Sequence, residues 1–475
     1  MAIDKKYIHY AIMFLLTAII CLCPPFGQIT KEGMLVLGVF VGVLYGWIFI
    51  DLIWPSFFGF TMLGILQLMG SVAAFATGFS NATWLMCLIV MIFAGAMEAM
   101  DVTTVIANWL LSRTIFQKSP WALIVGIAVI SYILGLLGLM LAVTFMMWAI
   151  IGRIAEECHI SKNEPILTYV IALVVMISTC AGITMPFQGA SLMYMGYYTQ
   201  AMGSAIPSRE FMIFAISVTI LITIVMILIG KFVMRLDASK FQLPQEIIAE
   251  IKTQKATSRQ KVGLAILIIY TLILVLPAVF DKMPGASYLN TIGIMGVTAV
   301  ALLLVSFIKI EGQPLADLTT LFSTKIQWPL MLLLAVTFPL ASLMQSSETG
   351  IMATVTAYVT PMVSQMGASL FMIGSMVILG LVTQVTHNIV LAAIFMPILC
   401  PLCAQLGANP ITLWFLLYIT LQCAYVTPAA SFTSALVHGH GLVDRKYAYI
   451  LGIVFLLITY VVLGIVGIPL GNLLF

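Results

Sequence analysis

A run of polar side chains interrupts an apolar stretch at residues 383–397. Its polar members are Thr383, Gln384, Thr386, His387 and Asn388. Hydrocarbon offers no hydrogen-bond partner, so such side chains must be satisfied by protein groups, an ion or enclosed water. Hydroxyl and amide oxygens can bind a small cation, whereas amide and imidazole N–H groups can donate to an anion. We interpret this run as a binding site inside a membrane.

A second polar interruption lies further along the chain, at residues 423–435. Its polar members are Thr427, Ser431, Thr433 and Ser434, and Pro428 lies among them. Proline removes a backbone donor and frees a carbonyl, which at membrane depth is a natural ligand for a small cation. The first half of the chain has a similar interruption at 184–191. Neither interruption, nor either hairpin tip at 138–144 and 383–388, contains lysine or arginine, so an anion there would be held by amides, hydroxyls and bound cations.

Two other interpretations of these residues stay open. Asn388, Thr386 and Thr383 could form a hydrogen-bonded cluster between helices, because membrane helices also associate through such side chains. His387 could carry a coupling proton, donate to a substrate or cap a helix.

The composition indicates a polytopic α-helical membrane protein. Of 475 residues, 62% are hydrophobic and 8% are charged, whereas soluble domains have roughly 45–50% apolar and about 25% charged residues. The net charge of +3 gives no reason to expect a nucleic-acid partner. The sequence has no HExxH motif, and we find no convergent acid pair or Ser/Lys dyad in the apolar runs, so we do not expect an enzyme.

Apolar runs long enough to cross a bilayer occur throughout the chain, and those at 54–72 and 351–366 are expected to lie partly at the interface. The runs at 121–157 and 368–406 are expected to form re-entrant helical hairpins, which leaves about eleven transmembrane helices. The segment 231–261 carries seven lysines and arginines, which by the positive-inside rule places it, and the N-terminus, in the cytoplasm.

The two halves of the chain resemble each other at separations of 243–246 residues. The matched pairs are Trp84 and Trp328, Thr103 and Thr349, Asn163 and Asn409, and Cys180 and Cys423. An odd number of crossings in each half would give the copies opposite orientations, the inverted repeat of many secondary transporters. The ligand site is then expected near the midplane, where the interruptions at 184–191 and 427–434 meet.

These residues resemble the divalent anion:sodium symporter family of the ion transporter superfamily, from about Ile29 onward. Residues 383–388 are similar to the tip of that family's second hairpin, and residues 424–441 to its second unwound helix. The resemblance implies an elevator-type carrier, a homodimer in which a transport domain moves against a fixed scaffold. The implied parts are a first scaffold part at 1–118, a first transport repeat at 119–236, a cytoplasmic linker at 237–261, a second scaffold part at 262–366 and a second transport repeat at 367–475.

The resemblance also implies site residues. Thr383, Thr386, Asn388 and the Ala430 carbonyl would bind sodium. Substrate would contact His387, Asn388, Ser431 and Thr433 from the second half and Thr144, Thr184 and Gln188 from the first.

The first half departs from the family pattern. Its hairpin, at 138–144, lacks a Ser-Asn-Thr motif, and its interruption lacks Pro-Pro-Asn. Whether the first half keeps an ion site therefore stays open. The more apolar pocket fits a substrate with one carboxylate and an apolar body, or a different anion, better than a compact dicarboxylate.

The sequence thus predicts a secondary active transporter of the cytoplasmic (inner) membrane that carries a small organic anion, a carboxylate, in symport with sodium. No cofactor is expected beyond sodium as the coupling ion, and the partners are the substrate, the lipid bilayer and a second copy of the chain. The main alternative is a proton-coupled, exchange or efflux carrier of the same superfamily. An ion channel or an intramembrane enzyme accounts for fewer of the observations.

Overall fold

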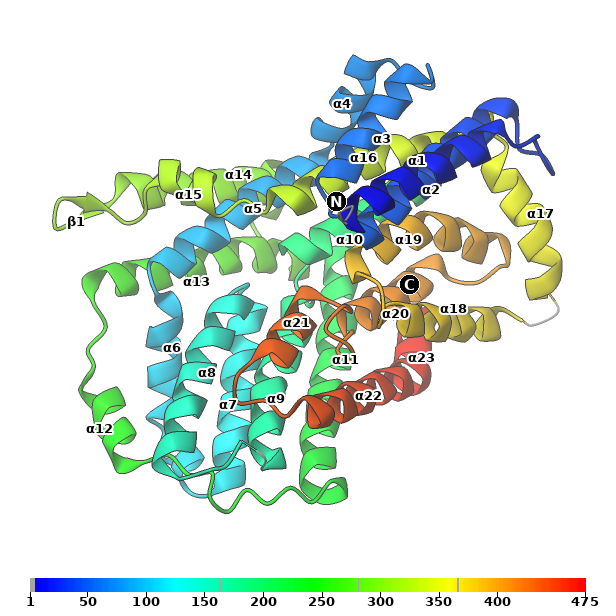
Figure 1. Ribbon diagram of the computed structural model, residues 1–475. Coiled ribbons are helices and arrows are strands. Elements are labelled where there is room, and N and C mark those ends of the chain that lie inside the picture. Colours follow the sequence, from blue (N-terminus) through cyan, green and yellow to red (C-terminus); the bar gives the residue numbers. More distant parts are fainter. Residues whose placement is uncertain (1–4, 163, 281, 365–366) are drawn as a thin grey trace.

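The protein is almost entirely helical in a computed structural model that describes residues 5–162, 164–280, 282–364 and 367–475 (Figure 1). Within these residues the exception is a small ladder in which β1, Lys309–Ile310, pairs antiparallel with β2, Gln313–Pro314. Nine of the described helices are long and apolar enough to cross a bilayer, judged by length and composition. The predicted all-α polytopic membrane class is confirmed.

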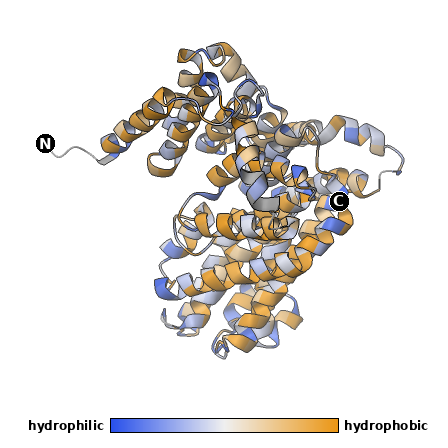
Figure 2. Cartoon of the chain, turned by 90° about the vertical axis from the view of Figure 1, so that its right-hand side faces the viewer, coloured by the Kyte–Doolittle hydropathy of each residue, from blue (hydrophilic) through white to orange (hydrophobic). Residues whose placement is uncertain are grey.

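Hydrophobic residues predominate along most of the helices (Figure 2), and many large apolar side chains are exposed. In α13, Ser258–Val279, and α14, Ala286–Phe307, only 28% and 22% of the apolar span is buried. Leu303 is 62% exposed and Phe307 is 83% exposed. Exposing apolar area to water costs roughly 25 cal/mol per Å², a cost that lipid removes. We interpret α13 and α14 as lipid-facing helices.

The two halves contain the same elements in the same order: a long helix, a shorter one, a helical hairpin, a broken helix and a final helix that ends in a π-helical turn. In the first half these are α5 Ala82–Ala99, α6 Val102–Leu111, α7 Pro120–Leu136 with α8 Met140–Glu157, α9 Pro165–Gly182 with α10 Gly189–Met202, and α11 Ser208–Leu228 with η2 Ile229–Val233. In the second half they are α16 Trp328–Gln345, α17 Ile351–Ser364, α18 Ala368–Val382 with α19 Asn388–Gln405, α20 Pro410–Gln422 with α21 Phe432–Gly439, and α22 Arg445–Val462 with η3 Leu463–Gly467. The repeat predicted from scattered residue pairs thus extends to details of the backbone.

Further helices lie outside this shared order, and several of them pack one half against the other. They are α1 Lys5–Leu22, α2 Lys31–Phe49, α3 Trp54–Ile65, α4 Ser71–Phe79, η1 Thr114–Gln117, α12 Gln245–Thr253, α13, α14, α15 Leu318–Thr324 and α23 Ile468–Leu474. The first-half helices α2, α3 and α4 pack on α16, and the second-half helices α13, α14 and α15 pack on α5. The two central helices also meet directly, since Trp84 Nε1 donates to the Met331 carbonyl at 2.9 Å. Each half therefore completes the packing of the other.

Both hairpins turn within a few residues. In the first, Ser119 caps α7 by accepting from the Ala122 N–H at 3.2 Å, and Gly138 makes the turn at φ +82°, a backbone region that favours glycine. In the second, the turn comprises residues 383–387. The first arms, α7 and α18, have 17 and 15 residues. A full crossing needs ~20 residues, so these lengths suit helices that turn back inside the membrane.

Each broken helix ends a few residues before a proline. Residues 183–188 separate α9 from α10 and include Pro186, and residues 423–431 separate α20 from α21 and include Pro428. Proline cannot donate the backbone hydrogen bond that continues a helix. The helices before the breaks are also the most enclosed: 89% of the α9 span is buried, and every residue of α20 from Thr412 to Gln422 is buried. The two breaks therefore lie in the interior.

The run at 54–72, expected to lie partly at the interface, forms two short helices. α3 ends at Ile65 and α4 begins at Ser71, because Gln67 takes a left-handed conformation at φ +56° and breaks the helix. Two further expectations, the match of Asn163 to Asn409 and a domain boundary at residue 366, rest on residues outside those that the structure describes.

The packing of the first hairpin on the first broken helix yields a stability prediction. A Cβ on Gly135 of α7 would collide with the Ser178 carbonyl and lie 2.9 Å from the Ser178 Cα. We expect Gly135→Ala to lower the free energy of unfolding by about 1–3 kcal/mol through overpacking, measured by thermal unfolding in detergent. Gly152→Ala on α8 is the matched control, because its nearest neighbour would be Leu442 Cδ1 at 3.9 Å. Equal stability of the two variants would contradict the close packing.

Candidate functional site

The second hairpin tip and the second break are joined by the Gln384 side chain. Its Nε2 donates to the Gly380 carbonyl at 2.7 Å, and its Oε1 accepts from the Val426 N–H at 2.9 Å. The Thr427 hydroxyl donates to the Gln384 carbonyl. Gln384 is 5% exposed, so water does not reach this junction. The Gln384 side chain instead satisfies the backbone groups that the turn and the break leave unpaired. The two polar interruptions predicted from sequence therefore form one unit.

Asn388, the first residue of α19, is buried against the end of α20. Its Nδ2 donates to Gln422 Oε1 at 3.0 Å. Its neighbour His387 is the N-cap of α19, and His387 Nδ1 accepts from the Ile389 N–H at 3.4 Å. Both side chains thus lie at the N-terminal, positive end of a helix, where an anion is stabilised.

The second break is held in shape by its own hydroxyls. Ser431 Oγ donates to the Ala424 carbonyl at 2.9 Å and accepts from the Ser434 N–H at 3.0 Å. Ser434 Oγ donates to the Thr427 carbonyl at 2.6 Å. Thr433 Oγ1 lies 3.1 Å from Ser431 Oγ. Ser431 and Thr433, predicted to contact substrate, are buried and are used in this conformation to close the loop.

Two buried hydroxyls of the second half are unpaired. Among the residues that the structure describes, Thr383 Oγ1 and Thr420 Oγ1 are buried without a hydrogen-bond partner. They come from helices in contact, since a Cβ on Gly380 of α18 would lie 2.6 Å from Thr420 Cγ2 of α20. Thr383 follows the last residue of α18, at the negative end of that helix. An unpaired oxygen there has the chemistry of a cation ligand.

The remaining predicted ligands are placed near this unit but are not shown to converge. Thr386 is half-buried in the turn, and Ala430 is buried in the break, where its N–H donates to the Thr427 carbonyl at 3.1 Å. The Asn388 amide nitrogen is engaged by Gln422. The four predicted sodium ligands thus share the hairpin and break, but within the described part of the chain no hydrogen bond joins them as a set.

The predicted first-half residues are engaged locally. Thr184 Oγ1 donates to the Ala181 carbonyl at 2.6 Å, and Thr144 Oγ1 donates to the Met140 carbonyl at 2.8 Å. Gln188 Nε2 donates to the Leu136 carbonyl at 2.6 Å. Gln188 therefore ties the first break to the first hairpin, as Gln384 ties the second hairpin to the second break.

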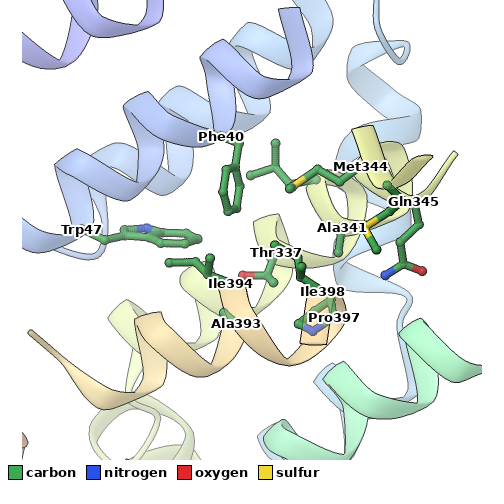
Figure 3. Close-up of a pocket in the computed structure, with 12 residues that line it drawn as sticks. Phe40, Trp47, Thr337, Ala341, Met344, Gln345, Ala393, Ile394, Pro397 and Ile398 are labelled. Atoms are coloured by element: carbon green, nitrogen blue, oxygen red, sulfur yellow. The ribbon is translucent and has the colours of Figure 1, made fainter. Parts of the chain in front are cut away.

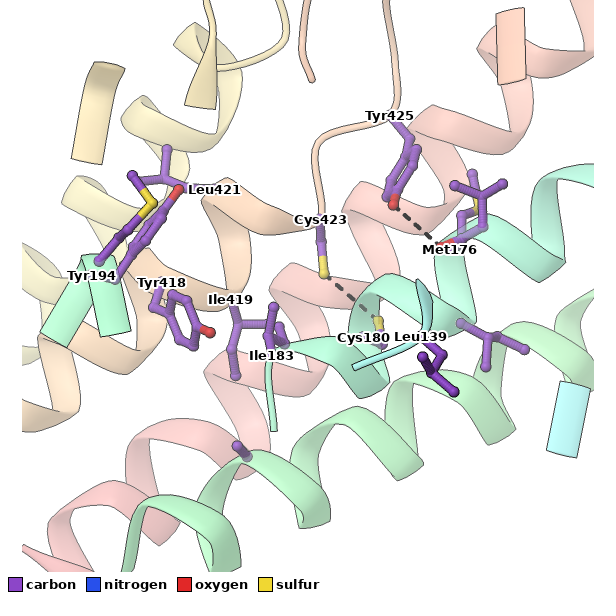
Figure 4. Close-up of a cluster of buried hydrophobic side chains, with 14 of the residues drawn as sticks. Leu139, Met176, Cys180, Ile183, Tyr194, Tyr418, Ile419, Leu421, Cys423 and Tyr425 are labelled. Carbon is purple, nitrogen blue, oxygen red and sulfur yellow. Dashed lines mark hydrogen bonds between the residues drawn. The ribbon is translucent and has the colours of Figure 1, made fainter. Parts of the chain in front are cut away.

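In the interior, the second break and the helix before it lie against the helices that flank the first break (Figure 4). Cys180 Sγ and Cys423 Sγ, which are matched residues of the repeat, lie 3.8 Å apart. Tyr425 OH donates to Thr179 Oγ1 at 2.5 Å, and Ser191 Oγ lies 2.8 Å from Tyr418 OH. Matched residues in contact are what a local two-fold relation between the halves requires.

Sequence reasoning did not select Gln422, Tyr425 or Tyr418. Gln422 had a detectable signal, an amide at the end of an apolar run directly before the second break. The two tyrosines had no such signal, because tyrosines in apolar runs commonly serve only for packing. Their hydrogen-bond partners in the structure show that they join the two halves.

A separate apolar pocket lies between α2, α16 and α19 (Figure 3). Phe40 and Trp47 line one side, and Pro397 lies opposite on α19. Of its lining residues only Thr337 and Gln345 are polar, and Thr337 Oγ1 already donates to the Leu333 carbonyl at 2.8 Å. Gln345 Nε2 is buried without a hydrogen-bond partner among the described residues, so this mainly apolar pocket offers one free amide donor.

The comparisons with known proteins indicate transport. Residues 35–420 match the family model described as citrate transporter (CitMHS). The YdaH transporter of Alcanivorax borkumensis is similar in structure, with 15% identity, coverage of 93% of this chain and 98% of that chain, and a TM-score of 0.59. MtrF of Neisseria gonorrhoeae, described with a class of antimetabolite efflux pumps, has 12% identity, coverage of 98% and 93%, and a TM-score of 0.56. No curated protein matches the chain by sequence. At these identities the two structures establish a common fold.

The role of Gln384 can be tested by stability. Gln384→Leu leaves the Gly380 carbonyl and the Val426 N–H unpaired, which we expect to cost about 1–3 kcal/mol for each buried group. The measurement is the unfolding transition in detergent. Gln405→Leu, an exposed glutamine at the far end of the same hairpin, should leave the transition unchanged. A similar effect of both variants on the unfolding transition would contradict the role of Gln384 in joining the second hairpin to the second break.

Proposed function

The chain belongs to the citrate transporter family, and from this premise we propose that it is a secondary active transporter that carries an organic anion, a carboxylate, across the cytoplasmic membrane in symport with sodium. The observation that carries the proposal is the junction of the second hairpin tip and the second break, made by Gln384, Val426 and Thr427. It brings a helix N-terminus and an unpaired hydroxyl to one unit inside the protein. The proposal includes the closer relation to the divalent anion:sodium symporter family.

The substrate side of the proposal rests on helix ends and neutral donors. Asn388 and His387 lie at the N-terminus of α19, and Ser431 is the N-cap of α21. Carboxylates are stabilised by such ends through unpaired N–H groups and the positive end of the helix dipole. The absence of lysine and arginine from both turns and both breaks makes the anion depend on a nearby cation, which favours coupling. Citrate is the first substrate to test.

The cation side rests on Thr383. Its buried, unpaired hydroxyl at the negative end of α18 supports a small cation, with Thr386, Asn388 and the Ala430 carbonyl as the further proposed ligands. A bound cation would offset the charge of the anion and complete its pocket, so the loaded transport domain crosses more readily than a partly loaded one. In this proposal the carrier is a homodimeric elevator, with the N-terminus and the 237–261 linker in the cytoplasm.

A proton-coupled or exchange carrier is the second candidate. His438 in α21 is buried, and among the described residues its Nδ1 has no hydrogen-bond partner. His438 Nε2 lies 3.4 Å from the Tyr425 carbonyl in the second break. An imidazole in that position, or His387 in the hairpin turn, could take up a coupling proton.

Ion replacement distinguishes the two candidates. In proteoliposomes we expect uptake of labelled citrate to require an inward sodium gradient and to fall to background when choline replaces sodium, at every pH tested. Uptake in choline that follows an imposed proton gradient would favour the proton-coupled carrier and reject sodium coupling. Loss of counterflow with retained ion conductance would instead indicate a channel.

Asn388 provides the mutational test. We expect Asn388→Ala to lower the apparent kcat/KM for uptake about tenfold or more, since a hydrogen bond to a charged group contributes ~1.5–3 kcal/mol. Size-exclusion elution and thermal unfolding verify that the variant folds after losing its bond to Gln422. Asn290→Ala, an exposed asparagine of α14, is the matched control. Wild-type uptake by folded Asn388→Ala would exclude Asn388 from the site.

A further inference from the structure

Four basic residues lie together beside the first hairpin, at the end where α7 begins. Arg113 and Lys118 flank the short helix η1, which packs on α7. Lys231 lies in η2, at the end of α11, and its Nζ is 5.9 Å from the centre of the Trp121 ring in the first turn of α7. Arg235 lies four residues beyond Lys231. Trp121 therefore joins the two pairs of cations into one basic cluster.

The charges of this basic cluster stay uncompensated in the described part of the chain. All four side chains are exposed, and none of them takes part in an ion pair there. The ion pairs found among the described residues are Lys6–Asp51, Arg153–Glu250, Lys240–Glu164 and Lys325–Glu98. The segments 102–120 and 229–236, which carry the cluster, contain no aspartate or glutamate. An anion from outside the chain can therefore pair with these cations.

Exposed apolar side chains surround the basic cluster. They are Trp109, Ile115, Phe232 and Val233. The Arg113 guanidinium carbon lies 4.2 Å from the centre of the Trp109 ring, and Lys231 Nζ lies 5.3 Å from the centre of the Phe232 ring. Aromatic side chains gather at the boundary between hydrocarbon and water, where long basic side chains extend toward the lipid headgroups. This combination indicates that the basic cluster lies at that boundary.

The partner that matches this surface is an anionic phospholipid. Its phosphate would pair with the cations and its acyl chains would cover the exposed apolar side chains, whereas a soluble anion would satisfy the charges alone. The cytoplasmic leaflet carries the anionic lipids, and the positive-inside rule assigns residues 231–261 to that side. We propose that the basic cluster is a binding site for the headgroup of an anionic phospholipid of this leaflet. The site is separate from the hairpin tips and breaks and does not depend on the proposed symport.

A bound headgroup would join two elements that are distant in the sequence. Lys118 lies directly before the N-cap of α7, where the first hairpin begins, and Lys231 lies at the end of α11. A phosphate that pairs with both holds the start of the hairpin against the end of α11. A ligand that binds the folded chain stabilises it, so lipid binding should raise the temperature of unfolding.

Lipid titration of the purified protein in a neutral detergent gives the test. We expect phosphatidylglycerol to raise the unfolding temperature more than phosphatidylcholine with the same acyl chains. In Lys231→Gln the half-maximal concentration of phosphatidylglycerol should increase about fivefold, because one basic residue near an anionic lipid surface contributes about that factor. Lys118→Gln, a change of an exposed residue, is the second variant and should act in the same way.

Lys255→Gln is the matched control, because Lys255 is an exposed lysine of the same predicted cytoplasmic segment outside the basic cluster. It should leave the response to phosphatidylglycerol unchanged. An equal weakening in Lys255→Gln would indicate general attraction between a positive face and anionic lipid, and wild-type responses of Lys231→Gln and Lys118→Gln would exclude the cluster. Either result overturns the proposal. An equal temperature increase with glycerol 3-phosphate, which has no acyl chains, would assign the cluster to a soluble phosphate and overturn it as well.

Trp121 gives a direct readout of where the lipid binds. Phosphatidylglycerol brominated in its acyl chains should quench tryptophan fluorescence more than brominated phosphatidylcholine, because the bound headgroup holds the chains near the Trp121 ring. This difference between the two lipids should shrink in Trp121→Phe, since that variant lacks the reporter. An undiminished difference in Trp121→Phe would place the bound lipid elsewhere on the protein and reject the site.

Discussion

Backbone groups buried away from water must find partners within the protein, and this constraint governs the centre of the molecule. Two hairpin turns and two helix breaks expose amides and carbonyls where lipid offers nothing. Two glutamines satisfy several of these backbone groups: Gln188 pairs the first break with the first hairpin, and Gln384 pairs the second hairpin with the second break. A third, Gln422, accepts from the side chain of Asn388. Long amide side chains suit the task because one end donates while the other accepts.

The halves share a plan but distribute polarity unequally. At the first hairpin the turn is Leu137-Gly138-Leu139, and its helix end is capped by a neutral amide. At the second hairpin the turn is polar and Thr383 retains an unpaired oxygen. Gln384 caps the end of α18 as Gln188 caps the end of α7, so the difference in polarity lies in the turn itself and in Thr383.

Much of the fold could be predicted because it follows from run length and from breakers. The hairpins, the breaks at Pro186 and Pro428 and the repeat all leave marks in composition and spacing. The exact point at which the run at 54–72 breaks could not be predicted, because the left-handed Gln67 has no sequence signature of its own. Hydrogen-bond partners between helices were harder to predict. The polar tip around Asn388 was evident from the sequence. The bond from Asn388 to Gln422 and the bond from Tyr425 to Thr179 depend on how each helix is rotated about its axis. Spacing within one helix cannot specify which face a distant helix presents.

The interlocked packing of the halves has a consequence for how such a chain can fold. The central helix α5 rests on α13–α15 from the second half, and α16 rests on α2–α4 from the first. Gly78 of α4 lies so close to the Ala335 backbone of α16 that a Cβ atom at position 78 would collide with it. A ribosome releasing only the first half would leave α5 without its cover and α2–α4 without their core. Maturation of the protein must therefore wait until the second half has entered the bilayer, and the early chain has to be kept from aggregating until then.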